Sequence, residues 1–145
     1  MNETKTNDPL REVARDALER VCSGSDASAA AGVYSERFRD HVNGRNYEGH
    51  EGIRESLALY QLVFRDGDLQ IRVEDQVTEG DKVASRWVAT GHNRGRPITT
   101  WGIVISTIED DEIIEDWAAS DSLEIVRQLG IRRTLLLGLD YLRRR

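Results

Sequence analysis

The spacing of apolar residues changes at Asp66-Gly67-Asp68. Before this point apolar residues recur about every 3.6 positions, as in amphipathic helices. After it they alternate with polar residues, as in strands, until the helical spacing returns at Asp121. Helices followed by an antiparallel meander are typical of an α+β domain with helices on one face of a curved sheet. A cone with a cavity is one such shape.

The predicted elements follow from these two periods and from capping residues. Asp8-Pro9 supplies an N-cap and a first-turn proline, so a first helix begins there and ends at Ser23-Gly24-Ser25. We expect Asp26 to cap a second helix that runs to about Phe38. The other predicted elements are a loop over 44–52, helices over 51–64, 121–129 and 131–142, and strands beginning at 69 and covering 82–92, 98–108 and 113–120.

Length and composition limit the kind of protein. The 145 residues favour a single domain over residues 9–145, after a flexible tail of residues 1–8. A net charge of -6 disfavours binding to nucleic acid and to anionic membranes. No apolar run approaches the ~20 residues of a membrane helix and the N-terminus does not resemble a signal peptide, so we expect a cytoplasmic protein. A lone cysteine, Cys22, excludes an internal disulfide and a thiolate metal site.

The middle strands are apolar on both faces, although helices are expected to cover only one face. The uncovered face needs a second cover, because large bare apolar patches are rare on soluble monomers. Five large apolar residues occupy alternate positions along three strands, and we therefore expect them to face the same side of the sheet. We predict a homodimer that forms sheet against sheet around them. These residues are Trp87, Trp101, Ile103, Ile105 and Trp117.

Several segments together resemble one known family. The most specific segment is Ile113-Ile114-Glu115-Asp116-Trp117, followed by Arg127-Gln128-Leu129-Gly130. Shorter matches are Phe38-Arg39-Asp40-His41, Glu79-Gly80-Asp81-Lys82-Val83 and Thr90-Gly91-His92. They resemble the SnoaL-like family, which has the fold of nuclear transport factor two. The resemblance implies a cone-shaped α+β barrel around a cavity, and an activity like that of anthracycline polyketide cyclases or cofactor-independent hydroxylases.

The resemblance also implies which chemistry is retained. Counted back without gaps from Arg127-Gln128-Leu129-Gly130, the polar positions of the family's aldol cyclases fall on Ala118, Val104, Gly102 and Asp40. Three of these have no polar group, so the usual ring closure lacks its acid and base. The related epoxide-hydrolase arrangement keeps Arg86 but has Val88 and Ala118 in place of its two acids. The hydroxylases, whose cavity is largely apolar, fit better.

Candidate site residues follow from strand parity and from these positions. We predict catalytic roles among Asp40, His41, Arg86, His92 and Asp121, although Asp121 precedes a helix and could simply cap it. The residues predicted to contact substrate are Tyr60, Phe64, Val88, Gly102, Val104, Asp116 and Ala118.

Three functions remain open at this stage. The first is a hydroxylase of an aromatic polyketide that uses no cofactor, with no metal, flavin or nicotinamide bound to the chain and with a separate reductase as a partner that could reduce the substrate. The second is an aldol cyclase with rearranged catalytic groups. The third is a non-catalytic carrier of a small ligand.

Overall fold

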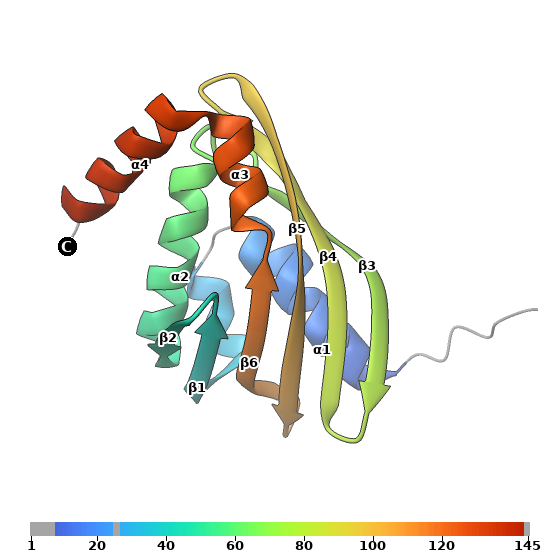
Figure 1. The fold of residues 1–145 in the computed structure, drawn as a ribbon. Helices are drawn as coiled ribbons and strands as arrows, with labels where there is room; N and C mark the ends of the chain where they lie inside the picture. The colour runs from blue at the N-terminus through green and yellow to red at the C-terminus, as the bar shows by residue number, and fades with distance from the viewer. Residues whose placement is uncertain (1–7, 25–26, 144–145) are drawn as a thin grey trace, which may run out of the picture.

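A single curved sheet organises the protein. The structure is a computed structural model that describes residues 8–24 and 27–143. Its strands follow the order β2-β1-β6-β5-β4-β3 (Figure 1), and neighbours are antiparallel except for the parallel pair of β1 and β6. The strands are β1 (Tyr34–Val42), β2 (Arg45–Glu48), β3 (Gln70–Glu79), β4 (Lys82–Asn93), β5 (Arg96–Glu109) and β6 (Glu112–Ser120).

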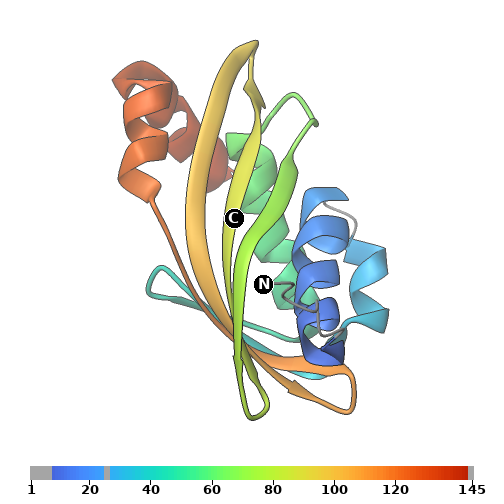
Figure 2. The same ribbon diagram turned by 90° about the vertical axis from the view of Figure 1, so that its right-hand side faces the viewer.

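Helices pack on one face of this sheet and at one end of it (Figure 2). The first begins where predicted, because the Asp8 carboxylate accepts a hydrogen bond from the Leu10 amide at 3.1 Å. This combination of helices and a mostly antiparallel sheet confirms the predicted α+β class. No helix in the described ranges is long and apolar enough to cross a membrane. The helical segments are α1 (Pro9–Asp16), the π-helical η1 (Ala17–Cys22), the 3-10 segment η2 (Ala27–Gly32), α2 (Gly49–Val63), α3 (Ser122–Leu129) and α4 (Ile131–Arg143).

Two predicted elements between residues 26 and 52 are wrong. The predicted second helix is only the short η2, and the residues up to Phe38 lie in β1 instead. The strand forms because this segment pairs with β6, beginning with a hydrogen bond from the Ile113 amide to the Val33 carbonyl at 2.9 Å. The predicted loop over 44–52 contains β2 and the start of α2. Asp26, the predicted cap, and the tail over 1–7 lie outside the described residues.

Two-residue turns fix the register of the hairpins. The turn from β4 to β5 is Arg94-Gly95, with φ of 50° and 77°, and Asp110-Asp111 between β5 and β6 has φ of 50° and 63°. Turns with two positive φ values match the right-handed twist of paired strands. The first turn places Trp87 opposite Gly102 and therefore on the same face of the sheet.

Trp87 lies inside the protein and not on the predicted dimer face. Its side chain is 3% exposed, and its ring packs edge-on against Tyr60, with centroids 6.4 Å apart. A Cβ on Gly102 would stand 2.4 Å from the indole, so the glycine leaves the space that the ring occupies. The prediction that Trp87 shares a face with Trp101 is wrong, because register, rather than residue type, decides which face each strand presents.

We expect Gly102→Ala to lower the free energy of unfolding by about 2 kcal/mol, because the added methyl group overlaps the Trp87 ring and an Ala119 carbonyl. Gly138→Ala in α4 is the matched control, since a Cβ there meets nothing within 4 Å. The control should raise stability by up to about 1 kcal/mol, because alanine favours helix. Urea denaturation measures both changes, and equal stability of the Gly102→Ala variant and the wild type would contradict this packing.

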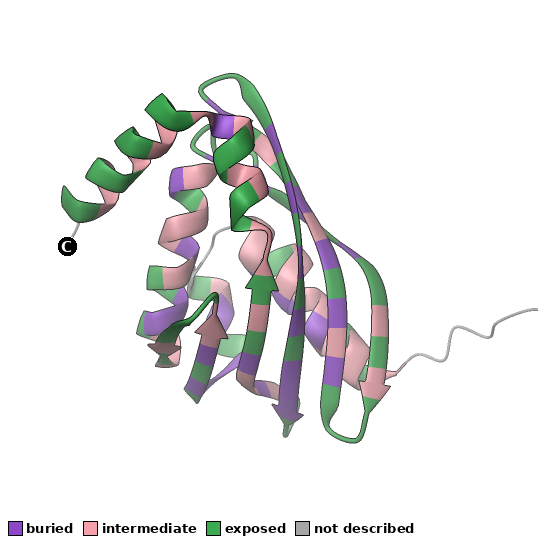
Figure 3. Cartoon of the chain, viewed as in Figure 1, coloured by how far each residue is buried: buried purple, intermediate pink, exposed green. Residues whose placement is uncertain are grey.

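The outer face of the sheet carries an exposed apolar patch made by the other four residues of the predicted set. Trp101 is 47% exposed and Trp117 is 58% exposed, and Ile103 and Ile105 are exposed between them. The register joins them across β5 and β6, with Ile105 opposite Trp117. In Figure 3 the exposed and buried residues alternate along β5, as expected for a strand with one face inside the protein and one outside.

Candidate active site

A pocket of about 340 Å³ opens between α2, β1 and the end of β6. We call it the inner pocket. Its wall is mostly apolar, with Val42, Leu59, Tyr60, Val63 and Ile125 as the larger side chains. Its polar lining includes the hydroxyl groups of Ser56 and Ser120. The pocket therefore suits a flat apolar molecule that carries a few hydrogen-bonding groups.

Two carboxyl groups lie side by side on the inner face of the sheet, next to this pocket. Asp40 of β1 and Asp116 of β6 are direct partners in the parallel register, and Ser106 of β5 is the next partner across the sheet. All three side chains are buried. The close pairing of two acids in a largely apolar interior is costly when both are charged, and such pairs are characteristic of sites that transfer protons.

Asp40 is the acid that contacts a residue lining the inner pocket. Burial raises the pKa of Asp40 to about 6, while the Ser56 hydroxyl and the nearby His41 act in the opposite direction. Ser56 also lines the pocket. A ligand hydroxyl that binds Ser56 is thus separated from the Asp40 carboxylate by a single side chain that can both donate and accept a hydrogen bond.

Asp116 is the acid whose pKa is raised further. Burial raises the pKa of Asp116 to about 8, the neighbouring Asp40 and Glu115 add to the rise, and Ser106 opposes it. Its Oδ1 atom is buried without a hydrogen-bond partner among the described residues. At neutral pH this carboxyl group is therefore largely protonated, and it presents a neutral O–H donor beside Asp40.

Other polar groups near the two acids stay neutral. Burial raises the pKa of Tyr60, although its interaction with the Ser120 hydroxyl opposes the change. The Cys22 sulfur lies 3.9 Å from the Tyr34 hydroxyl, and burial raises the pKa of the thiol to about 12. Because neither the phenol nor the thiol ionises near neutral pH, Asp40 is the group with a pKa suited to act as a base.

Four residues predicted to be catalytic do not line the inner pocket. His41 is on the outer face of β1, where it stacks on Trp117 with ring centroids 4.0 Å apart. Arg86 also faces outward and pairs with Asp75. These side chains point outward because Asp40 and Trp87, their neighbours in sequence, point inward.

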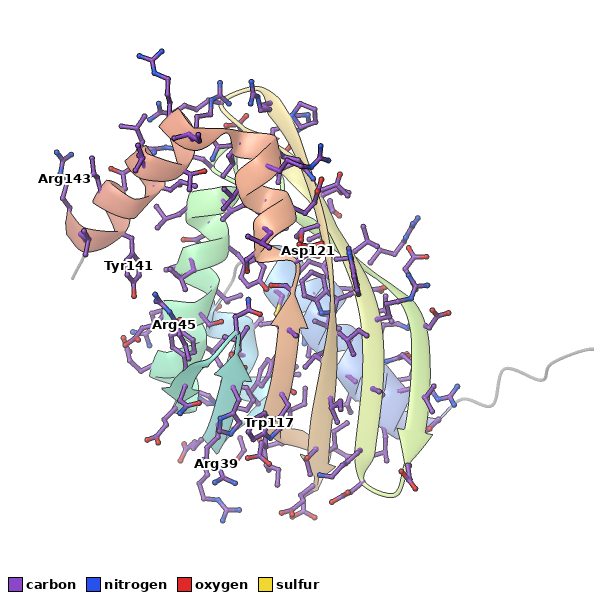
Figure 4. The ribbon with its side chains drawn as sticks, in the orientation of Figure 1. Arg39, Arg45, Trp117, Asp121, Tyr141 and Arg143 are labelled. Atoms are coloured by element: carbon purple, nitrogen blue, oxygen red, sulfur yellow. The ribbon has the colours of Figure 1, made fainter. Side chains whose placement is uncertain are left out.

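The other two have local structural roles. His92 is exposed and its Nδ1 contacts the Asp68 carboxylate at 2.5 Å, and this hydrogen bond holds the pKa of Asp68 below its usual value. Asp121 caps α3 by accepting a hydrogen bond from the Glu124 amide at 3.0 Å. In Figure 4 it lies at the end of β6, where α3 begins. None of His41, Arg86, His92 and Asp121 lines the inner pocket, and catalytic roles for them stay predictions.

Of the predicted substrate contacts, Tyr60 lines the inner pocket. Phe64 and Val104 are buried in the core beneath it, and Ala118 packs against that core. Gly102 lies under the Trp87 ring, and Val88 faces outward opposite Trp101, which corrects its predicted place in the cavity.

Sequence reasoning missed Ser56 and Ser120. A usable signal existed for Ser56, which lies three residues after Ile53 and four before Tyr60 and so falls on the inward stripe of α2. Ser120 lies two residues after Ala118 and four after Asp116 along β6, and this spacing places all three on the inner face.

Within residues 8–24 and 27–143, no three His, Cys, Asp or Glu side chains are grouped to hold a metal ion. The site as described consists of a small apolar pocket, a serine that reaches a base, and a neutral buried acid. Such a site can remove a proton from a bound molecule and stabilise the resulting anion by hydrogen bonds.

Comparison with solved structures identifies the fold. A Bacillus cereus protein named as a candidate polyketide cyclase has a TM-score of 0.75 and 24% identity, with 90% of this chain and 85% of that chain covered. IdmH of Streptomyces antibioticus, also named as a candidate polyketide cyclase, gives 0.72 and 24%, covering 86% of this chain and 99% of that one. AclR of Streptomyces galilaeus, named as a candidate hydroxylase, gives 0.71 and 15%, covering 83% and 84%.

Comparison at the sequence level identifies the family. No curated protein matches the sequence significantly. The sequence does match the family described as SnoaL-like polyketide cyclase over residues 12–129, which contain β1 to β6, α2 and α3 and thus every residue of the inner pocket and both buried acids. By this match the chain belongs to the SnoaL-like polyketide cyclase family, as its sequence resemblance indicated.

Proposed function

We propose that the protein is a hydroxylase that uses no cofactor and acts on an aromatic polyketide in its reduced form. The observation that carries the proposal is the contact between Ser56, which lines the inner pocket, and Asp40, a buried base with a raised pKa. The family supports a polyketide-type substrate. The structural similarity to AclR is consistent with hydroxylation, although at 15% identity it speaks only for the fold.

The proposed reaction begins with the substrate hydroxyl group. This hydroxyl donates to Ser56, whose own proton passes to the Asp40 carboxylate, and the substrate becomes a phenolate. Charge spreads onto the adjacent ring carbon, which forms a C–O bond with dioxygen. The resulting hydroperoxide loses water as its O–O bond breaks. A hydroquinone and dioxygen thus give a hydroxyquinone and water. Dioxygen accepts four electrons in this reaction. Two come from oxidation of the hydroquinone to a quinone, and two come from hydroxylation of the ring carbon.

The apolar wall of the inner pocket has two roles in this scheme. It orients a flat ring system, and it keeps water away from the hydroperoxide. In the cell a separate reductase would supply the hydroquinone from the quinone, so the protein itself needs no redox group.

Incubation with 1,4-dihydroxynaphthalene under oxygen tests this function. We expect the purified protein to accelerate formation of 2-hydroxy-1,4-naphthoquinone, with one new oxygen atom derived from labelled dioxygen by mass spectrometry. Background oxidation in buffer gives 1,4-naphthoquinone without a new oxygen atom. A protein that binds the hydroquinone tightly but leaves the product distribution at the background level would be a ligand carrier, and this result would contradict the proposal.

Ring closure is the second candidate function, and Asp116 favours it. An aldol cyclisation needs a base for a C–H proton and an acid for the acceptor carbonyl, and Asp40 and Asp116 have pKa values that separate these two roles. Formation of a new ring from a linear aromatic keto ester in the absence of oxygen would favour this function over hydroxylation.

The proposal also includes a homodimer through the exposed patch of Trp101, Ile103, Ile105 and Trp117. Residues of both charge signs rim this patch as ion pairs, such as Arg39 with Glu115 at 3.2 Å. In Figure 4 Arg39 and Trp117 lie together near the lower end of β1 and β6. Two copies related by a two-fold axis therefore cover their own apolar surface without an excess of like charge.

We expect Trp101→Glu to convert the dimer to a monomer, because the substitution places two carboxylates near the two-fold axis. Leu135→Glu is the matched control, since Leu135 is also exposed but lies on α4, outside the patch. Light scattering coupled to gel filtration at micromolar concentration measures the mass. A wild type that is monomeric, or a control that dissociates equally, would contradict the sheet-to-sheet dimer.

A further inference from the structure

A second and larger pocket lies beside the inner pocket. It has a volume of about 810 Å³ and is enclosed by β2, α2 and the C-terminal end of α4. We call it the outer pocket. Its lining includes Arg45, Tyr47, Glu51, Glu55 and Tyr141, so it carries charged groups of both signs, whereas Arg45 is the one charged residue in the lining given for the inner pocket.

The helix α4 that borders the outer pocket lies beyond the segment that matches the family. The match to the family ends at residue 129, and α4 covers Ile131–Arg143. The Arg45 Nη1 donates to the Tyr141 hydroxyl at 2.5 Å, and the guanidinium lies 5.0 Å from the centre of the ring. In Figure 4 Tyr141 points from α4 toward Arg45.

Further contacts fix the position of α4 over α2. An ion pair joins Arg65 of the α2–β3 connection to Asp140 at 2.8 Å. The Arg133 guanidinium donates to the Asn93 carbonyl at 2.8 Å. Because α4 is attached near both of its ends, the outer pocket is a formed feature of the fold and not an incidental gap.

The two pockets are neighbours that share part of their lining. Three residues, Arg45, Tyr47 and Leu59, line both of them. A ring system seated in the inner pocket against Ser56 would therefore direct a substituent past these residues and under α4. The volume of the outer pocket is sufficient for a substituent of several heavy atoms.

The chemistry of the outer pocket indicates the kind of substituent. The Arg45 guanidinium supplies donors, and the carboxylates of Glu51 and Glu55 supply acceptors. The faces of Tyr47 and Tyr141 supply flat apolar surface, and Leu59 and Leu62 complete the wall. Donors, acceptors and aromatic faces in one pocket suit a group with many hydroxyls on one side of its rings and C–H bonds on the other.

We propose that the outer pocket binds a sugar carried by the aromatic substrate, so that the protein acts on a glycoside with its ring system in the inner pocket. This inference rests on the proposed function for the identity of the ring system. It assigns to α4 a role in substrate choice, because Tyr141 of that helix forms one wall of the sugar site.

Binding of the naphthol 1,5-dihydroxynaphthalene and of its mono-β-D-glucoside, which keeps one free ring hydroxyl for Ser56, is measured by calorimetry on the full chain and tests the inference. We expect the wild type to bind the glucoside about tenfold more tightly than the naphthol, as one or two added hydrogen bonds and an aromatic contact would give. Glu55→Ala and Tyr141→Ala should each remove most of this preference and leave naphthol binding unchanged. Glu109→Ala, an exposed glutamate in neither pocket, is the control.

A glucoside that binds no more tightly than naphthol would overturn the inference. So would a preference that survives both Glu55→Ala and Tyr141→Ala. Neither result affects the hydroxylation of 1,4-dihydroxynaphthalene, which has no sugar and is assayed separately. Conversely, the protein could prefer the glucoside and yet fail to hydroxylate 1,4-dihydroxynaphthalene. This result would contradict the proposed function and would still support the sugar site.

Discussion

Replacing Asp40 with asparagine is expected to reduce turnover by roughly 10²- to 10⁴-fold, the usual contribution of a general base. Asparagine keeps the size of the side chain and its interaction with Ser56 but cannot accept a proton at neutral pH. The rate of the wild type should rise with pH through about 6, where the carboxyl group of Asp40 loses its proton, and then level off. The Asp40→Asn variant should not show this rise.

The pH profile separates a role in proton transfer from a structural role. A variant that is merely misfolded would lose activity at every pH and would bind naphthol poorly, whereas Asp40→Asn should still bind it. Asp111→Asn is the control, because Asp111 is exposed in the β5–β6 turn and asparagine tolerates its positive φ. Turnover by Asp40→Asn at the wild-type rate would exclude Asp40 as the base.

Asp116→Asn is expected to stabilise the protein at alkaline pH. The folded-state pKa of Asp116 is raised to about 8, so the folded protein holds a proton that the unfolded chain releases above its ordinary pKa near 4. The contribution of Asp116 to stability is therefore fully present below pH 4 and declines as pH rises toward 8. The decline is about 1.4 kcal/mol for each pH unit over that window.

Urea denaturation at pH 5 and pH 8.5 measures this difference. The wild type should lose stability between the two values, and Asp116→Asn should lose markedly less, because asparagine has no proton to release. Asp111→Asn again serves as the control and should follow the wild type. Parallel pH dependence of the wild type and Asp116→Asn would show that Asp116 is not held protonated in the folded protein.

The sequence predicts the class of fold well, because that prediction rests on local patterns. The change of period at Asp66-Gly67-Asp68 correctly separates α2 from the meander, and the Asp8 cap correctly starts α1. The segment at 34–38 is mispredicted for a non-local reason. Its strand is stabilised by pairing with β6, which lies at the far end of the domain sequence and which no local pattern can indicate.

Part of the predicted site lies in or next to the inner pocket, and the residues that face elsewhere have one main cause in common. Asp40 and Asp116 are both among the predicted residues, but their pairing depends on the parallel contact of β1 and β6. The predicted faces of Arg86, Trp87 and Val88 are wrong, because the alternation of faces along β5 does not extend to β4 unless the register of the two strands is known. The Arg94-Gly95 turn contains that register, since two residues in a tight hairpin turn place Asn93 opposite Arg96 and therefore Trp87 opposite Gly102.

Hydrogen exchange at the substrate carbon, without oxygen, tests the central claim most directly. The claim is that Asp40 removes a proton from a reduced aromatic substrate in the inner pocket, and this step precedes any reaction with dioxygen. In anaerobic D2O, the ring carbon of the phenolate takes up a deuteron in place of dioxygen and then loses its original proton. The wild type should therefore accelerate uptake of deuterium at C2 of 1,4-dihydroxynaphthalene, as measured by NMR, and the acceleration should increase with pH through about 6. Asp40→Asn should exchange at the rate of buffer alone. Equal acceleration by the wild type and Asp40→Asn would contradict the account.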